Sequence, residues 1–102
     1  MQWIELIHLR TFTQHDKDEA VAAFHQLVPP TAGRPLAGIT LLRDAALDTD
    51  LIIFIRWLAN VSEKNKSALG LQLASTFSEF GLIHHTVWSD EADLVAEVEK
   101  IA

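Results

Sequence analysis

The sequence predicts a single α+β domain in which helices cover one face of a four-stranded antiparallel sheet. Three observations predict this fold class. The chain has 102 residues, which is the size of one domain. Strand-like and helix-like hydrophobic patterns follow one another in the order βαββαβ, with a further helical pattern at the end. Residues 51–58 are apolar on both faces, which is typical of a strand that is shielded on both sides.

Composition excludes several classes of function. The net charge of −6 would repel a phosphate backbone, so nucleic acid is not an expected partner. The absence of cysteine excludes disulfides, thiolate zinc ligands and cysteine nucleophiles. The first residues lack the basic region of a signal peptide, and the longest apolar run, residues 51–55, is too short to span a membrane. We therefore expect a cytoplasmic protein without a membrane partner.

The first predicted strand, residues 3–11, has two partly apolar faces, because apolar residues occur at both odd and even positions. Residues 16–28 are expected to form a helix, since apolar residues recur there at helical spacing. Asp16 and Glu19 have the spacing of a capping-box variant at its start, and Pro29 ends it.

The second and third strands are expected over residues 37–43 and 51–58, joined by the Asp-rich hairpin loop 44–50. Burying one large apolar side chain is worth roughly 1.5–3 kcal/mol. Leaving one face of the third strand exposed would therefore be costly and would promote aggregation. The simplest cover is the sheet of a second copy, giving a symmetric homodimer with a barrel-like centre. The alternative cover is the C-terminal helix, folded across the open face.

The second long helix is expected over residues 60–80. Asn60 or Ser62 would be its N-cap, and Gly81 would follow its C-terminus. Gly70 inside this helix costs about 1 kcal/mol relative to alanine. We therefore expect Gly70 to mark either close packing or a local weakening of the helix.

Residues 82–88 are the fourth expected strand, and Ser89 is the expected N-cap of a final helix. Asp90, Glu91 and Asp93 would lie in its first turn, where they match the helix dipole. The order βαββαβ with right-handed crossovers predicts a ferredoxin-like sheet with strand order 4-1-3-2, followed here by the C-terminal helix.

The element order, the two-faced third strand ending in Trp57 and the stretch SALGLQLASTFSEFGLIHHTVW resemble the dimeric α+β barrel superfamily. That superfamily includes antibiotic-biosynthesis monooxygenase-like proteins and haem-degrading monooxygenases, and the resemblance covers residues 3–88. It implies a homodimer with a buried pocket for a small molecule. The haem-degrading branch uses an Asn on the first strand, a Trp near the third and a His on the second long helix. Trp57 matches that Trp, but the first strand has His8 and no Asn, and residues 60–80 contain no His, so no cofactor is expected.

Histidine and arginine side chains on the strands are the candidate site residues, because imidazole titrates near neutral pH and a guanidinium binds acidic groups. His84 and His85 point to opposite faces of a strand, so they cannot easily share a metal ion. One of them should lie across from His8, since the fourth strand pairs with the first, and Arg56 on the third strand would complete the cluster. The predicted catalytic residues are His8, Arg56, His84 and His85, and the predicted pocket walls are Trp57 and Trp88.

The same residues have structural interpretations. His8 can be a core histidine that bonds a carbonyl or hydroxyl. Arg56 can pair with Glu5 or Asp44, or reach solvent at the end of a strand. The tryptophans can belong to the core or to the dimer interface.

Three functions remain open from the sequence. The first is a small-molecule enzyme, a cofactor-independent monooxygenase or isomerase acting on an aromatic or acidic metabolite. It requires a cavity of roughly a few hundred Å³ lined by His8, Arg56 or Trp57. The alternative is a non-catalytic ligand-binding or dimerising interaction module. Haem binding with degradation is a third and less favoured function.

Overall fold

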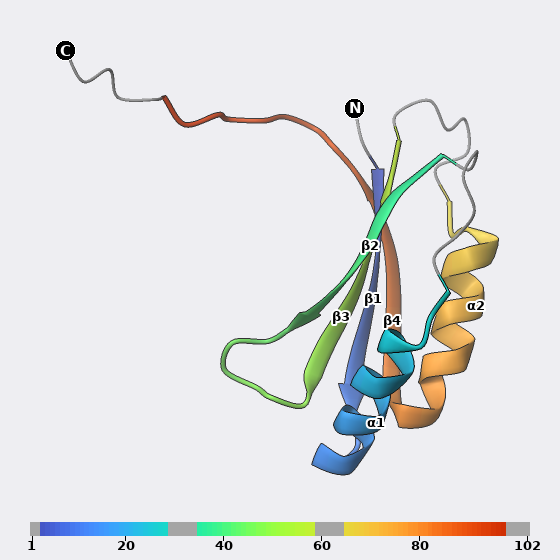
Figure 1. Cartoon of the computed structure of the whole chain (residues 1–102). Helices are drawn as coiled ribbons and strands as arrows, with labels where there is room; N and C mark the ends of the chain where they lie inside the picture. Colours follow the sequence, from blue (N-terminus) through green and yellow to red (C-terminus); the bar gives the residue numbers. More distant parts are fainter. Residues whose placement is uncertain (1–2, 29–34, 59–64, 98–102) are drawn as a thin grey trace.

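The computed structural model describes residues 3–28, 35–58 and 65–97, and Figure 1 shows the course of the chain. The elements follow in the order β1 (Trp3–Thr11), α1 (Gln14–His25), β2 (Leu36–Arg43), β3 (Asp50–Trp57), α2 (Ala68–Phe77), a short 3-10 helix η1 (Ser78–Phe80) and β4 (Gly81–Ser89). This is the predicted βαββαβ order, and each strand begins and ends within one residue of its expected position.

The strands form one antiparallel sheet in the order β2-β3-β1-β4. This is the predicted 4-1-3-2 order read from the opposite edge, and it places β1 and β3 in the centre. Both helices lie on the same side of the sheet (Figure 1). The ferredoxin-like α+β arrangement is therefore confirmed.

The helix-covered face of the sheet carries the core. Side chains alternate between the two faces of a strand, so every second residue of β1 and β3 is buried beneath the helices. Trp3 and Trp57 stack there, with ring centroids 5.3 Å apart and planes 12° from parallel. The buried apolar residues are Trp3, Ile7, Leu9, Ala20, Leu51, Ile53, Ile55, Trp57, Leu73, Phe77 and Phe80.

The helix α1 starts two residues earlier than expected, because its N-cap is Thr13. The Thr13 hydroxyl accepts a hydrogen bond from the backbone N–H of Asp16 at 3.0 Å and donates one to the Asp16 carboxylate at 2.9 Å. The helix ends at His25, short of the predicted residue 28. Residues directly before a proline disfavour the helical conformation, which is consistent with an end ahead of Pro29.

The helix α2 begins at Ala68, with Ser67 as its N-cap. The Ser67 hydroxyl accepts a hydrogen bond from the backbone N–H of Gly70 at 2.9 Å. The prediction of a helix over residues 60–80 is therefore wrong at residues 65–67, which are not helical; the expected start at residue 60 and the expected caps Asn60 and Ser62 lie outside the described residues. At its C-terminal end the helix tightens into η1 before β4 begins.

The C-terminal helix predicted after Ser89 is not formed over residues 90–97. This segment, the C-terminal arm, has no regular secondary structure and extends away from the sheet (Figure 1). Its apolar side chains, Leu94 and Val95, are almost completely exposed. Short helices are marginal in water unless they bury an apolar face, so favourable capping and dipole residues do not suffice here. Residues 98–102 lie outside the described part of the chain.

The second face of the sheet, the open face, is covered by no element of the described residues. Its central strands present half-buried apolar side chains, and its edges present more exposed ones. These residues are Ile4, Leu6, Ile52 and Phe54 in the centre and Leu42, Leu82 and Trp88 toward the edges. Among the described helices, none is long and apolar enough to cross a membrane.

Candidate functional site

A fully buried carboxylate, that of Glu5, lies between β1 and the N-terminus of α2. Trp57 Nε1 donates a hydrogen bond to one of its oxygens at 2.7 Å, and the Ser67 hydroxyl donates to the same oxygen at 2.5 Å. The Ser67 backbone N–H donates to the other oxygen at 2.9 Å, and His85 Nε2 lies 2.9 Å from that oxygen. Each carboxylate oxygen therefore has two partners, and the four residues form the Glu5 cluster.

The register of the sheet brings the cluster together. Glu5 is directly opposite Ile55 of β3 and Val87 of β4. Trp57 and His85 are diagonal neighbours of Glu5 on the same face: Trp57 is two residues after Ile55, and His85 is two residues before Val87. Diagonal neighbours are roughly 7–8 Å apart, within reach of long side chains. The Glu5 side chain can therefore contact a residue on each adjoining strand.

The close approach of α2 to the sheet depends on Gly70. A Cβ atom at this position would collide with the Glu5 carboxylate and would press on the His85 ring. The prediction that Gly70 marks close packing is therefore confirmed. The carboxylate also lies at the N-terminus of α2, where the helix dipole favours a negative charge.

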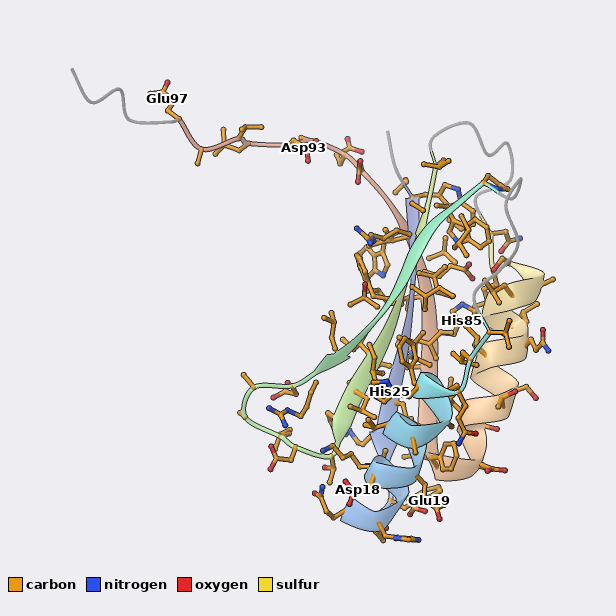
Figure 2. All side chains as sticks on the ribbon, in the orientation of Figure 1. Asp18, Glu19, His25, His85, Asp93 and Glu97 are labelled. Atoms are coloured by element: carbon orange, nitrogen blue, oxygen red, sulfur yellow. The ribbon has the colours of Figure 1, made fainter. Side chains whose placement is uncertain are left out.

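The contact with Glu5 determines which ring nitrogen of His85 carries a proton. Because the carboxylate oxygens accept hydrogen bonds, Nε2 donates, and Nδ1 of the neutral ring is then an acceptor. A carboxylate that orients an imidazole also stabilises the imidazolium that forms when the ring takes a proton. The His85 side chain is only 5% exposed and lies beside α2 (Figure 2), so such a transfer would be shielded from bulk water.

A second polar cluster lies on the open face. His8 Nε2 is 3.2 Å from the buried Asp50 carboxylate, and Arg10 Nε is 3.6 Å from the same oxygen. His84 is the cross-strand partner of His8. A shallow hollow of about 290 Å³ adjoins this cluster. Its lining residues are His8, Arg10, Leu82, Ile83 and His84.

The predicted site residues are therefore divided between the two faces of the sheet. His8 and His84 face each other as expected, whereas His85 joins Glu5 on the opposite face. Arg56 is exposed on the open face, but it is four residues along β3 from the partner of His8, a separation of about 13 Å. Arg56 thus does not join His8, and Arg10 and Asp50 take its place. Within the described ranges, no three His, Asp or Glu side chains are grouped as a metal site.

The two predicted pocket walls also differ in their surroundings. Trp57 is buried against Trp3 and donates to Glu5. Trp88 is 56% exposed on the open face, and its indole N–H donates to the Thr86 hydroxyl at 2.8 Å. Of the two, only Trp57 lies on the helix-covered face.

An apolar pocket of about 350 Å³ lies between the end of α1 and β2. Ile39, in its lining, is paired with Ile55, which is itself paired with Glu5. The pocket and the Glu5 cluster thus share the helix-covered face, and Glu5 itself lies about 10 Å, or two strand spacings, from Ile39. The lining residues are Phe24, Leu27, Val28, Leu36, Ala37, Gly38 and Ile39.

Sequence reasoning did not identify Glu5, Ser67 or Asp50 as site residues. The sequence does contain an indication for Glu5. It is the one charged residue among the side chains that share one face of the first strand, which are Trp3, Glu5, Ile7 and Leu9. A charge on a core-facing position needs buried partners. Ser67 and Asp50 carry no comparable signal, because both residue types are common at helix caps and in loops.

No family model matches the chain, and no curated protein matches it in sequence. Solved structures do match it. The structure of Rv0793 from Mycobacterium tuberculosis aligns with a TM-score of 0.61 and 16% identity, covering 93% of this chain and 100% of that one. A point mutant of SnoaB, a cofactor-independent oxygenase from Streptomyces nogalater, aligns with a TM-score of 0.58 and 14% identity, covering 91% and 96%.

A protein of Deinococcus radiodurans that is classed with the antibiotic biosynthesis monooxygenases aligns with a TM-score of 0.65. Its identity to this chain is 8%, and the alignment covers 93% of this chain and 98% of that one. These matches extend over nearly the whole length of both chains. The chain therefore has the ferredoxin-like α+β fold of the antibiotic biosynthesis monooxygenases, which is the fold expected from its sequence.

Proposed function

We propose that this chain is a cofactor-independent monooxygenase that removes a proton from a small aromatic molecule, with His85 as the base and Glu5 as the group that orients it. The observation that carries the proposal is the full burial of the Glu5 carboxylate against His85. The fold shared with SnoaB, a cofactor-independent oxygenase, supports the same class of reaction.

Stability alone does not account for this pair. Removing two charged or polar groups from water costs several kcal/mol, and packed apolar residues of similar volume are often as stabilising. Titratable groups that converge in a buried position are therefore candidates for catalysis. In this chain the convergence uses residues from β1, β3, β4 and the start of α2, so it depends on the completed fold.

The proposed reaction balances without a redox group in the protein. His85 Nδ1 takes a proton from an activated CH2 group of the substrate, and the resulting carbanion gives its electrons to dioxygen as a C–O bond forms. The imidazolium returns its proton to the peroxide, and loss of water leaves a ketone. The sum is R2CH2 + O2 → R2CO + H2O, in which the substrate carbon is oxidised and both oxygen atoms are reduced.

The apolar pocket beside α1 supports an aromatic substrate. Its volume of about 350 Å³ lies within the usual range for small-molecule sites. The pocket is about two strand spacings from Glu5 and three from His85 on β4, with the buried Ile55 between, so an elongated substrate would have to extend past Ile55 to reach His85. The substrate would bind its rings there and present its acidic hydrogen toward His85.

We also propose that two copies pair through the open face. The apolar side chains of that face are half-buried or exposed in one copy, and a second sheet would bury them. The extended C-terminal arm, with its exposed Leu94 and Val95, supports contact with a neighbouring copy. The hollow beside His8 and His84 would then lie inside the dimer.

Oxygen uptake tests the proposed reaction. The purified protein is incubated with a panel of two- and three-ring hydroxyaromatic compounds that carry an activated CH2 group, and oxygen and substrate are followed together. We expect them to be consumed in equal amounts. His85→Gln and Glu5→Gln should lower the rate by about 10²-fold or more, the usual size of a general-base contribution.

His25→Gln is the matched control, because His25 is exposed on α1 and should retain the wild-type rate. Oxygen uptake that is unchanged in His85→Gln, or absent with every compound while the protein is folded, would contradict the proposal. Proton exchange of the substrate without oxygen uptake would indicate an isomerase instead.

A further inference from the structure

A second pocket on the helix-covered face lies between the first half of α1 and the end of β2. Its volume is about 350 Å³. Two of its side chains are positively charged, and apolar side chains form the rest of the wall. We call it the basic pocket, and its lining residues are Lys17, Val21, Leu41, Arg43 and Leu51.

The helix and the sheet each position one of the two cations. Lys17 is four residues before Val21 in α1, so both side chains lie on the same side of the helix. Arg43 is directly opposite Leu51, whose side chain is buried in the core, so Arg43 also lies on the helix-covered face. The two cations therefore come from different elements and meet at this pocket only in the completed fold.

Lys17 is unusually buried for a lysine of a surface helix. Its side chain is 14% exposed, and among the described residues its ion-pair partner is Asp18, with an oxygen 3.8 Å from Nζ. The Asp18 side chain is 64% exposed and does not line the pocket, and surface pairs of this kind contribute little. Lysine is rarely buried unless it is paired with an anion, so the pocket leaves a place for a stronger partner.

Arg43 adds a second positive charge that the pocket does not balance. Within the described parts of the chain, its side chain has no hydrogen-bond or ion-pair partner. None of the described lining residues is acidic, although the chain as a whole has a net charge of −6. Two cations at one pocket repel each other, and an anion bound between them would be attracted by both.

We infer that the basic pocket binds a small carboxylic acid with an aliphatic body, whose carboxylate lies between Lys17 and Arg43. A guanidinium can bind a carboxylate through two parallel hydrogen bonds, and an ammonium adds a point charge. The apolar wall of Val21, Leu41 and Leu51 matches the aliphatic body, whereas an inorganic anion would leave that wall without a contact. The basic pocket adjoins the first half of α1 and the apolar pocket of the proposed function adjoins its end, so this inference does not depend on the proposed reaction.

Matched ligands test the inference in the wild-type protein. The affinities of hexanoate, of its uncharged counterpart hexanamide and of acetate are measured by calorimetry. We expect hexanoate to bind at least about tenfold more tightly than hexanamide, which is the effect of one hydrogen bond between charged groups. Hexanoate should also bind at least about tenfold more tightly than acetate, because each buried methylene group strengthens binding by about fourfold. The Arg43 Nε–H signal in NMR spectra should shift with hexanoate but not with hexanamide, which tests the contact without any variant.

Two variants test the cations separately. Lys17→Met keeps an apolar stem of similar length, and Arg43→Gln removes the guanidinium. Each should weaken hexanoate binding by about tenfold or more and leave the hexanamide affinity unchanged. Lys66→Gln is the matched control, because it removes one exposed positive charge outside the basic pocket and should leave the hexanoate affinity unchanged.

Equal affinities for hexanoate and hexanamide, or hexanoate binding that is unchanged in both Lys17→Met and Arg43→Gln, would overturn the inference. An equal loss of hexanoate binding in Lys66→Gln would overturn it as well, because the effect would then come from net charge. Inorganic phosphate that binds as tightly as hexanoate would reject the aliphatic ligand, and the absence of any hexanoate binding would reject the site.

Discussion

Replacement of Gly70 by alanine should destabilise this protein, although the same change stabilises most helices. In an ordinary helix interior the gain is about 1 kcal/mol. Here the new methyl group would collide with the Glu5 carboxylate and press on the His85 ring. Overpacking of this kind costs typically about 1–3 kcal/mol, and each hydrogen bond to a charged group that is lost costs about 1.5–3 kcal/mol.

If one of these hydrogen bonds is lost, we expect a net loss of about 1.5–5 kcal/mol in the free energy of unfolding after the helix-propensity gain is deducted. Urea denaturation followed by circular dichroism measures it, at one fixed protein concentration because association shifts apparent stability. Gln72→Ala is the matched control: Gln72 is exposed on the same helix, and its replacement should change the stability by less than about 0.5 kcal/mol. A Gly70→Ala variant that is as stable as the wild type, or about 1 kcal/mol more stable, would refute the close contact between α2 and Glu5.

Other parts of the structure give three further predictions. Backbone N–H groups in the β2–β3 loop lower the pKa of Asp44, so Asp44→Ala should reduce stability at neutral pH. Denaturation curves recorded from neutral to acidic pH measure this difference. It should vanish as the pH falls below the ordinary aspartate pKa of about 3.9 and then through the lower pKa of Asp44 in the folded protein. Thr13→Ala should lower the free energy of unfolding by about 1 kcal/mol, because it removes the N-cap of α1. Urea denaturation measures this loss, with Thr13→Ser as the control. Leu82→Lys on the open face should weaken self-association in sedimentation by at least about tenfold, whereas Leu71→Lys on the outer surface of α2 should not; equal behaviour of the two variants would contradict pairing through the open face.

The sheet could be predicted from the sequence because its signals are local and consistent. Residues 3–11 and 51–58 both have apolar side chains on two faces, which is typical of strands in the centre of a sheet. The C-terminal helix could not be predicted in the same way. Capping and dipole signals after Ser89 are local, but a helix also needs a surface for Leu94 and Val95, and the described chain provides none.

The candidate site could be predicted only in part. Alternation shows that His84 and His85 point to opposite faces, but it does not show which of them faces the helices, since both faces of β4 are partly apolar. The sequence predicts Arg56 near His8 because the two residues lie on adjoining strands. The four-residue offset between them depends on the register of β1 and β3, which no local pattern determines.

The protonation of the His85 ring tests the central claim most directly. Long-range ¹H–¹⁵N correlation spectra of the wild type are recorded over a series of pH values, and the tautomer of the neutral His85 ring is determined. The structure requires a proton on Nε2, held by Glu5, and an unprotonated Nδ1 that is able to act as a base. A ring with its proton on Nδ1, or one that exchanges freely between the two forms, would contradict a base oriented by Glu5.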